Sequence, residues 1–159
     1  MGSGNAVRAT QHEDDKLTRL VERLIDVTGV GLADRITVAG RKTLSVFVGL
    51  CERHFLHASC RPSVAGPHVA ENDTDSLWIF NVSTESKLLV LLETLCRDVR
   101  PGGTVAIDLG SLSPKTYPFR LRHALAQSGF TPGQQKAVMI DQELFLVARK
   151  GVPLRAVAA

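Results

Sequence analysis

Two polar residues stand directly after short apolar runs, at positions where the strands of an α/β protein would end. Asn81 follows the run 77–80, and Asp108 follows the run 104–107. Open α/β sheets bind ligands in the crevice outside the carboxyl ends of their strands, so these residues mark the best position for a residual site. Both residue types also terminate strands and cap the helices that follow, and we favour this structural interpretation.

The sequence Gly40-Arg41-Lys42-Thr43 follows an apolar segment and suggests a phosphate-binding loop. Such a loop needs glycine directly before the lysine and a second glycine five positions earlier. Here Arg41 precedes Lys42, and Ile36 occupies the other position. The favoured interpretation is a solvated basic start of a helix, with anion binding at the helix N-terminus as the alternative.

Cysteine and histidine recur at intervals of three, a spacing that suggests zinc: Cys51, His54, His57 and Cys60. On a helix, each step of three turns the side chain by ~300°, so these four fan across half the circumference and do not meet at one point. The series is also expected to cross from a helix into a strand. We therefore predict no metal site.

The chain has 3 cysteines, an odd number, with no Cys-x-x-Cys pair. Each of them, Cys96 included, is surrounded by apolar residues, where a free cysteine packs as a small hydrophobic side chain. This usage favours a reducing compartment over a disulfide framework.

Composition narrows the class of protein. A chain of 159 residues with 44% hydrophobic and 22% charged residues fits one domain with a core of its own. The net charge of +3 is mild and the basic residues are scattered, so we predict no nucleic-acid partner. The sequence has no apolar run long enough for a membrane span and no signal peptide, which predicts a cytoplasmic protein without membrane contacts.

The first half predicts alternating helices and strands. Residues 1–12 are polar and aperiodic and are predicted to be a disordered lead-in, whereas residues 13–28 show helical periodicity. A strand is expected at 35–39, a helix after it, a further strand at 56–60 and a loop at 61–75. The apolar stripe of the first helix comprises Leu17, Leu20, Val21, Leu24 and Ile25; that of the second comprises Leu44, Phe47, Val48, Cys51 and Phe55.

The second half continues the alternation. Strands are predicted at 77–80 and 104–107, and helices at 85–99 and 117–127, with Arg100-Pro101-Gly102-Gly103 breaking the first of these helices. The runs 137–140 and 144–147 are joined by only a short turn, which requires an antiparallel hairpin. We therefore predict an α/β, Rossmann-like, mostly parallel sheet with a C-terminal antiparallel hairpin and helices on both faces. The domain spans 13–150, and 151–159 form a tail or the start of a linker.

Residues 77–107 resemble the class I S-adenosylmethionine-dependent methyltransferases. The stretch 95–105, with its Pro-Gly-Gly turn, is similar to that family's segment before its fifth strand. Residues 126–130 resemble its short Gly-Phe step, and 140–146 its terminal hairpin. The resemblance implies a methyltransferase-like fold over residues 13–150.

The departures from this family concern its cofactor site. The family's first strand carries an acidic residue and runs into a Gly-x-Gly loop, whereas segment 37–43 has one glycine, no acid, and the cations Arg41 and Lys42. These cations would obstruct and repel the sulfonium cofactor. The second strand ends at Arg61 instead of an acidic residue, and 61–75 is too short for the next helix–strand unit, so a third strand is expected to be missing. We predict no catalytic, cofactor-binding or metal-binding residues.

The truncated pattern resembles the N-terminal domain of the anamorsin family in size, in the shortened middle and in the strand, Leu-rich helix and Arg-Pro-Gly-Gly segment. This resemblance implies a non-catalytic protein-interaction domain for cytosolic iron–sulfur cluster assembly and electron transfer, with no cofactor of its own. The partners it implies are a diflavin reductase and a monothiol glutaredoxin. The alternatives are a small S-adenosylmethionine-dependent methyltransferase with an atypical cofactor loop, or an inactive partner subunit of a methyltransferase.

Overall fold

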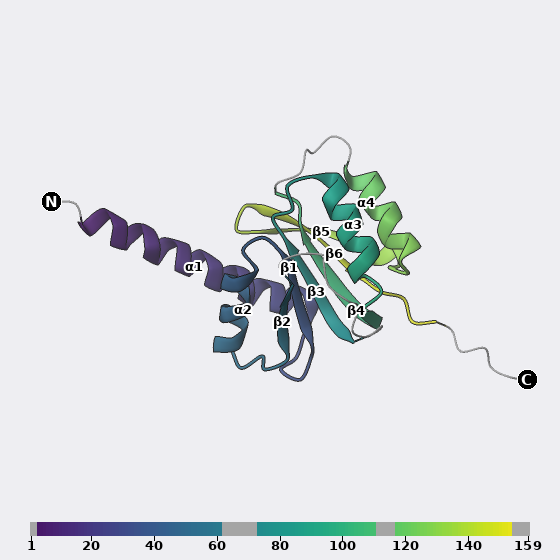
Figure 1. Cartoon of the computed structure of the whole chain (residues 1–159), viewed down its shortest axis with the longest axis horizontal. Helices are drawn as coiled ribbons and strands as arrows, with labels where there is room; N and C mark the ends of the chain where they lie inside the picture. Colours follow the sequence, from purple (N-terminus) through teal and green to yellow (C-terminus); the bar gives the residue numbers. More distant parts are fainter. Residues whose placement is uncertain (1–2, 62–72, 111–116, 154–159) are drawn as a thin grey trace, which may run out of the picture.

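The structure is a computed structural model that describes residues 3–61, 73–110 and 117–153 (Figure 1). Within these ranges the chain alternates helices and strands as predicted. In chain order the elements are α1 (Ser3–Thr28), β1 (Ile36–Gly40), α2 (Thr43–Glu52), β2 (Ala58–Arg61), β3 (Thr74–Phe80), α3 (Glu85–Leu95), β4 (Val99–Asp108), α4 (Tyr117–Gln127), a short 3-10 helix (Pro132–Gln134), β5 (Lys136–Ile140) and β6 (Glu143–Arg149).

Six strands form one sheet in the order β2-β1-β3-β4-β6-β5. The first four run parallel, and β6 pairs antiparallel with both β4 and β5. This arrangement confirms the predicted Rossmann-like sheet with a terminal hairpin. On the described part of the chain, β2 is an outer strand; the missing third strand was predicted for residues 61–75, most of which lie outside the described ranges.

Helices cover both faces of the sheet, as Figure 1 shows. The α1 and α2 helices pack on one face, where Leu24, Leu50 and Trp78 belong to one apolar cluster. The α3 and α4 helices pack on the other, where Leu92, Leu125 and Ile79 belong to a second cluster. Because strand side chains alternate between faces, the neighbours Trp78 and Ile79 lie in different clusters. The sheet is thereby buried on both sides, which holds the strand ends in fixed positions.

The hairpin turn is built as its sequence predicts. Asp141 and Gln142, the two residues between β5 and β6, both have a positive φ, of 46° and 69°. Two-residue turns with positive φ at both positions match the right-handed twist of paired strands. Side chains of α1 fasten this turn: Lys16 Nζ lies 2.8 Å from Glu143 Oε1, and Arg19 Nε lies 3.2 Å from Asp141 Oδ2.

The first helix is longer than predicted. It begins at Ser3, so the prediction of a disordered lead-in over residues 1–12 is wrong from residue 3 onward. Residues 7–15 are exposed, and this half of α1 extends beyond the sheet (Figure 1). It lacks apolar periodicity because it buries no face, yet after Gly4 it contains no glycine or proline to interrupt the helix.

The second helix buries a different face from the predicted one. Val46 and Leu50 are buried, together with Gly49, whereas Leu44 and Val48 are 69% and 45% exposed. Apolar residues lie on most sides of this helix, so its sequence does not select one face. Contact with α1 and the sheet makes that selection.

The Pro-Gly-Gly segment lies in a strand, which corrects the prediction that it breaks a helix. Helix α3 ends at Leu95, where a turn replaces it, and β4 already begins at Val99. Gly102 has φ 80° and donates its N–H to Lys150 O at 2.9 Å. A Cβ on Gly103 would lie 2.7 Å from Asp75 O, so glycine is required where β4 passes β3.

No helix within the described ranges combines the length and the hydropathy that crossing a membrane requires.

Candidate functional site

The carboxyl edge of the parallel strands brings the two predicted residues together. Asn81 directly follows β3, and Asp108 ends the adjacent strand β4. Asn81 adopts a left-handed conformation with φ 49°, and its backbone N–H donates to the Asp108 carboxylate. The predicted helix-capping role of Asn81 is wrong, because Thr84 caps α3 by accepting from Lys87 N at 3.3 Å.

Several charges and hydrogen bonds at this edge act on the Asp108 carboxylate. Its Oδ1 accepts the Gly110 N–H at 2.8 Å. Burial raises the pKa of Asp108 above its ordinary value and the negative Glu143 adds to this, while the hydrogen bonds from Gly110 and Asn81 and the charge of Lys42 act in the opposite direction. A carboxyl group with a raised pKa in a ligand crevice has the properties of a proton donor or acceptor.

The raised pKa of Asp108 predicts that its charge destabilises the fold at neutral pH. The folded-state pKa lies above the unfolded one, so the penalty is fully present at high pH, begins to fall as pH drops through the folded value and is gone below the unfolded value. Replacing Asp108 with asparagine should therefore raise the free energy of unfolding at pH 7 by on the order of 0.5 kcal/mol, a value discounted for solvent screening. Urea unfolding at pH 7 and at about pH 3 measures it.

The gain from this substitution should vanish below about pH 4, where the aspartate is protonated in the unfolded chain as well. Replacing the exposed Asp26 of α1 with asparagine is the control, and it should not raise the free energy of unfolding at pH 7. A loss of stability at pH 7 in the Asp108 variant would show that the carboxylate is held by favourable contacts.

The end of β1, at Gly40, lies in close contact with the neighbouring strand β3. A Cβ on Gly40 would lie 3.1 Å from the carbonyl carbon of Phe80 and closer still to its oxygen, and Gly40 has φ 95°. The same oxygen accepts the Arg41 N–H at 3.0 Å. Glycine is therefore used here to let one strand end pass another, and the backbone amide of Arg41 is already satisfied by protein.

Lys42 keeps a backbone typical of glycine. It adopts the left-handed conformation, φ 59° and ψ 18°, immediately before α2, where its side chain forms no capping hydrogen bond. This conformation costs a residue with a side chain roughly 1–2 kcal/mol. Arg41 and Lys42 are both exposed, as the predicted basic helix start requires.

The cysteines and histidines lie apart. Cys51 is on α2, Cys60 is on β2, and His54 and His57 are in the connection between them. No group of three potential ligands of the His, Cys, Asp or Glu type is close enough to hold a metal ion in the described ranges.

The three thiols differ in environment. Only Cys96 is buried, and burial raises the pKa of its thiol to about 12, which keeps it protonated. Cys51 is exposed and Cys60 half-buried, so the prediction that all three pack in apolar surroundings is correct for Cys96 and wrong for Cys51.

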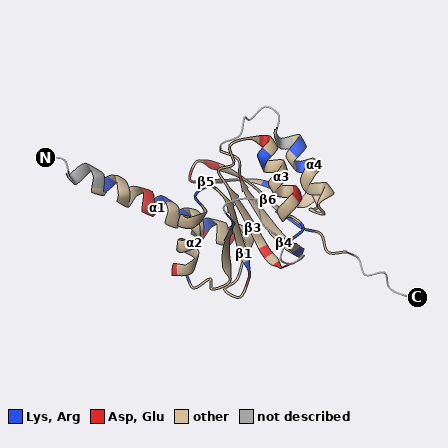
Figure 2. Ribbon diagram, in the orientation of Figure 1, with Lys and Arg blue, Asp and Glu red and all other residues tan. Residues whose placement is uncertain are grey.

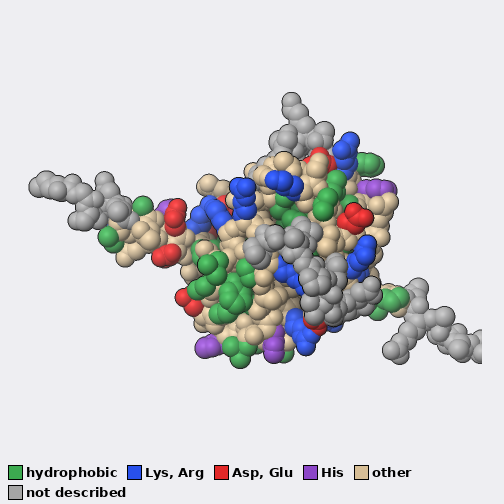
Figure 3. Space-filling model, viewed as in Figure 1, with side chains coloured by type: hydrophobic (Ala, Val, Ile, Leu, Met, Phe, Trp, Pro, Cys, Tyr) green, Lys and Arg blue, Asp and Glu red, His purple; other side chains and the backbone are tan. Residues whose placement is uncertain are grey.

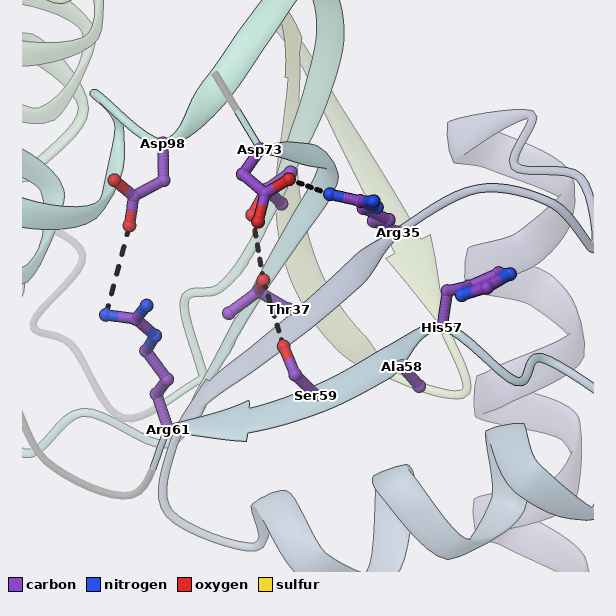
Figure 4. A pocket seen from close by; sticks show the side chains of 9 residues that line it. Arg35, Thr37, His57, Ala58, Ser59, Arg61, Asp73 and Asp98 are labelled. Carbon is purple, nitrogen blue, oxygen red and sulfur yellow. Dashed lines mark hydrogen bonds and ion pairs between the residues drawn. The ribbon is translucent and has the colours of Figure 1, made fainter. Parts of the chain in front are cut away.

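A polar pocket of about 270 Å³ lies at the opposite, amino end of the strands (Figure 4). The sequence did not predict this pocket. Thr37 Oγ1 forms hydrogen bonds with Thr74 Oγ1 at 2.9 Å and with Ser59 Oγ at 3.3 Å. Two ion pairs, Arg35 with Asp73 and Arg61 with Asp98, lie at its sides. Because its two cations pair with its two carboxylates, the geometry favours a structural network over a ligand site.

The polar residues Thr37, Ser59 and Arg61, which strand periodicity places on one sheet face, are the signal that could have indicated this pocket. These side chains share the sheet face of Leu77, since Thr37 pairs with both Ser59 and Leu77 in register. A polar row on a face that is otherwise apolar marks the place where the helix layer on that face does not reach.

Comparison with known proteins identifies the fold. No family model matches the sequence, and no curated protein matches it. Solved structures match along most of the chain. The tRNA (m1A58) methyltransferase of Aquifex aeolicus is similar with a TM-score of 0.62 and 10% identity, over 85% of this chain and 69% of that chain.

Two further structures have the same architecture. A chain from the complex between the Haloferax volcanii Trm112 methyltransferase activator and a methyltransferase matches with a TM-score of 0.60 and 11% identity, over 91% of this chain and 94% of that chain. The 1,6-didemethyltoxoflavin-N1-methyltransferase of Burkholderia thailandensis matches with a TM-score of 0.56 and 13% identity, over 94% and 84%. Likeness at this identity establishes the fold, which is that of class I S-adenosylmethionine-dependent methyltransferases, and leaves the activity open.

Proposed function

We propose that this methyltransferase-like domain acts by binding another protein and not by transferring a methyl group. The observation that carries the proposal is the close contact between residues 40–41, at the end of β1, and Phe80 of β3. Gly40 lies against Phe80 O, the Arg41 amide is bonded to that oxygen, and two exposed cations follow. A sulfonium cofactor approaching this edge would meet positive charge and an amide that is already engaged.

The second candidate is an S-adenosylmethionine-dependent methyltransferase with an atypical loop. The solved structures similar to this chain favour it, since they include two methyltransferases by name. Asp108 and Asn81 also favour it, because a carboxyl group of raised pKa beside a backbone amide lies where ligands bind in such folds. An inactive partner subunit of a methyltransferase is the third candidate.

The biological setting is proposed on sequence resemblance alone. Similarity to the N-terminal domain of the anamorsin family supports a role in cytosolic iron–sulfur cluster assembly, with a diflavin reductase or a monothiol glutaredoxin as the partner. None of the structural matches reported above concerns iron–sulfur proteins, so this setting rests on the shortened middle of the chain and on the Arg-Pro-Gly-Gly segment.

A cofactor titration tests the proposal. Amide-resolved NMR of the whole chain is recorded while S-adenosylmethionine or S-adenosylhomocysteine is added up to millimolar concentration, with an active methyltransferase as the positive control. We expect no shifts clustered at Gly40 to Lys42 or at Asn81. The two cofactor forms differ in charge, so the neutral sulfur form separates electrostatic repulsion from simple obstruction.

Saturable shifts at these residues would overturn the proposal and favour the methyltransferase. In that event, replacing Lys42 with glycine should strengthen binding of the cationic cofactor, because it removes a positive charge and relieves the left-handed backbone. Shifts confined to a distant surface would leave the proposal standing, since they would report non-specific contact.

A further inference from the structure

A groove of about 750 Å³ lies between α3 and α4, on the face of the sheet opposite α1 and α2. The half-buried Leu89 and Ala124 line it, and Phe119 borders it with 79% of its surface exposed. The upper right of Figure 3 shows hydrophobic, histidine and basic side chains side by side over these two helices. A groove that combines exposed apolar side chains with charged ones is a typical form for a binding surface.

The exposed ring of Phe119 lies parallel to the ring of His123. Phe119 stacks on His123, one helical turn later on α4, with ring centroids 6.3 Å apart and ring planes 6° from parallel. Aromatic residues of this kind carry a large share of binding energy at protein interfaces.

The charge around the groove is mostly positive. Arg97, Arg120 and Lys150 line it with His123, against the single carboxylate of Glu93. Lys150 Nζ is fixed by hydrogen bonds to Cys96 O at 2.9 Å and Val99 O at 2.8 Å. No ion pair among the described residues uses Arg97 or Arg120, so both guanidinium groups are available. Figure 2 colours the basic positions of α4 blue.

We propose that this groove binds an acidic segment of a partner protein, with an apolar side chain of the segment on Phe119 and Leu89 and its carboxylates near Arg97 and Arg120. The inference rests on the proposed protein-binding function and identifies its docking face. Complementary charge steers the encounter and selects acidic partners, while burial of the aromatic ring contributes most of the affinity.

The groove fits a peptide better than a nucleic acid. Single strands are bound by several stacking aromatics along a basic track, whereas this groove offers only Phe119, already stacked on one side. The Glu93 carboxylate in the lining would also repel phosphates.

The test uses the whole chain and a labelled synthetic peptide made of glutamates, with leucines at helical spacing. Fluorescence anisotropy gives the affinity, and amide-resolved NMR locates the site. We expect saturable binding with shifts on α3 and α4. Substituting Arg120→Glu or Phe119→Ser should each weaken binding by about tenfold or more.

Matched substitutions elsewhere serve as controls. Leu44→Ser removes a comparably exposed apolar side chain on α2, and Arg23→Glu reverses an exposed charge on α1. Both should leave the affinity within about twofold. A peptide with lysine in place of glutamate should fail to bind, and added salt should weaken the glutamate peptide.

Three results would overturn the docking face: no binding of the glutamate peptide, shifts that lie outside α3 and α4, or tighter binding of a poly(uridine) oligonucleotide in the same groove. Circular dichroism of each variant verifies that it is folded. The outcome is separable from that of the proposed function, since cofactor shifts at Gly40 to Lys42 would refute the latter without involving this groove.

Discussion

Replacing Gly40 with alanine is expected to lower the free energy of unfolding by about 3 kcal/mol. The new methyl group would overlap the Phe80 carbonyl, a backbone group fixed inside the sheet, and the residue would keep a φ of 95°. A left-handed conformation costs a residue with a Cβ roughly 1–2 kcal/mol, and overpacking typically adds 1–3 kcal/mol. For a chain of this length, thermal denaturation should show a fall in Tm of roughly 6–12 °C.

Gly133 provides the matched control for this substitution. A Cβ there would meet no atom within 4 Å, and the residue does not have a positive φ. Gly133→Ala should therefore be neutral or stabilise the protein by up to about 1 kcal/mol, because alanine has fewer unfolded conformations to lose. Equal stability of the two variants would contradict the close approach of β1 and β3. The proposal that residues 40–42 do not bind a cofactor depends on this approach.

Replacing Trp78 with alanine is expected to cost about 3–5 kcal/mol of unfolding free energy, the usual range for removing a buried large aromatic side chain. Trp78 is fully buried in the cluster beneath α1 and α2. Its Nε1–H donates to Ser76 Oγ at 2.9 Å, and Ser76 Oγ lies 2.7 Å from Thr104 Oγ1. The loss combines a cavity with a disturbed buried polar chain, and urea denaturation measures it.

Trp78→Phe separates these two contributions. Phenylalanine keeps most of the apolar volume but cannot donate to Ser76, so we expect a loss of about 1–2 kcal/mol. If this variant were as unstable as the alanine variant, the hydrogen bond would dominate and the cavity would be minor. If both variants were close to the wild type, Trp78 would not belong to the core, contrary to its position in the structure.

The stability predictions and the site concern the same strands. Gly40, Phe80 and Trp78 belong to β1 and β3, whose carboxyl ends lie beside Lys42 and Asn81. A variant that separates these strands would open the edge beside Lys42 and Asn81. Cofactor titration of the Gly40 variant, if it remains folded, therefore shows whether the close approach of the strands is what closes this edge.

Local sequence predicted the features that nearest neighbours control. The hairpin follows from a two-residue turn in which Asp141 and Gln142 both tolerate a positive φ. Helix α4 begins and ends at Tyr117 and Gln127, as its spacing predicts. Alternation of short apolar runs with amphipathic segments was sufficient to predict a mostly parallel sheet with helices on both faces.

Residues in the candidate site were predictable only in part. The sequence placed Asn81 and Asp108 correctly at neighbouring strand ends, because the carboxyl ends of parallel strands lie at the same edge of a sheet. The polar pocket around Thr37 and the groove beside Phe119 were not predicted. Each combines residues from three or more separated segments, and no local pattern encodes such a combination.

Tertiary structure decided the remaining features. Helix α2 is apolar on most sides, and only packing against α1 and the sheet selects Val46 and Leu50 as its buried face while Leu44 and Val48 stay exposed. The Pro-Gly-Gly segment joins β4 because Gly103 fits where a Cβ would strike Asp75 O. The sequence by itself determined periodicity and turn chemistry, which are properties of adjacent residues. Burial, strand contact and charge pairing depend on which distant segments meet, and only the assembled fold settles that.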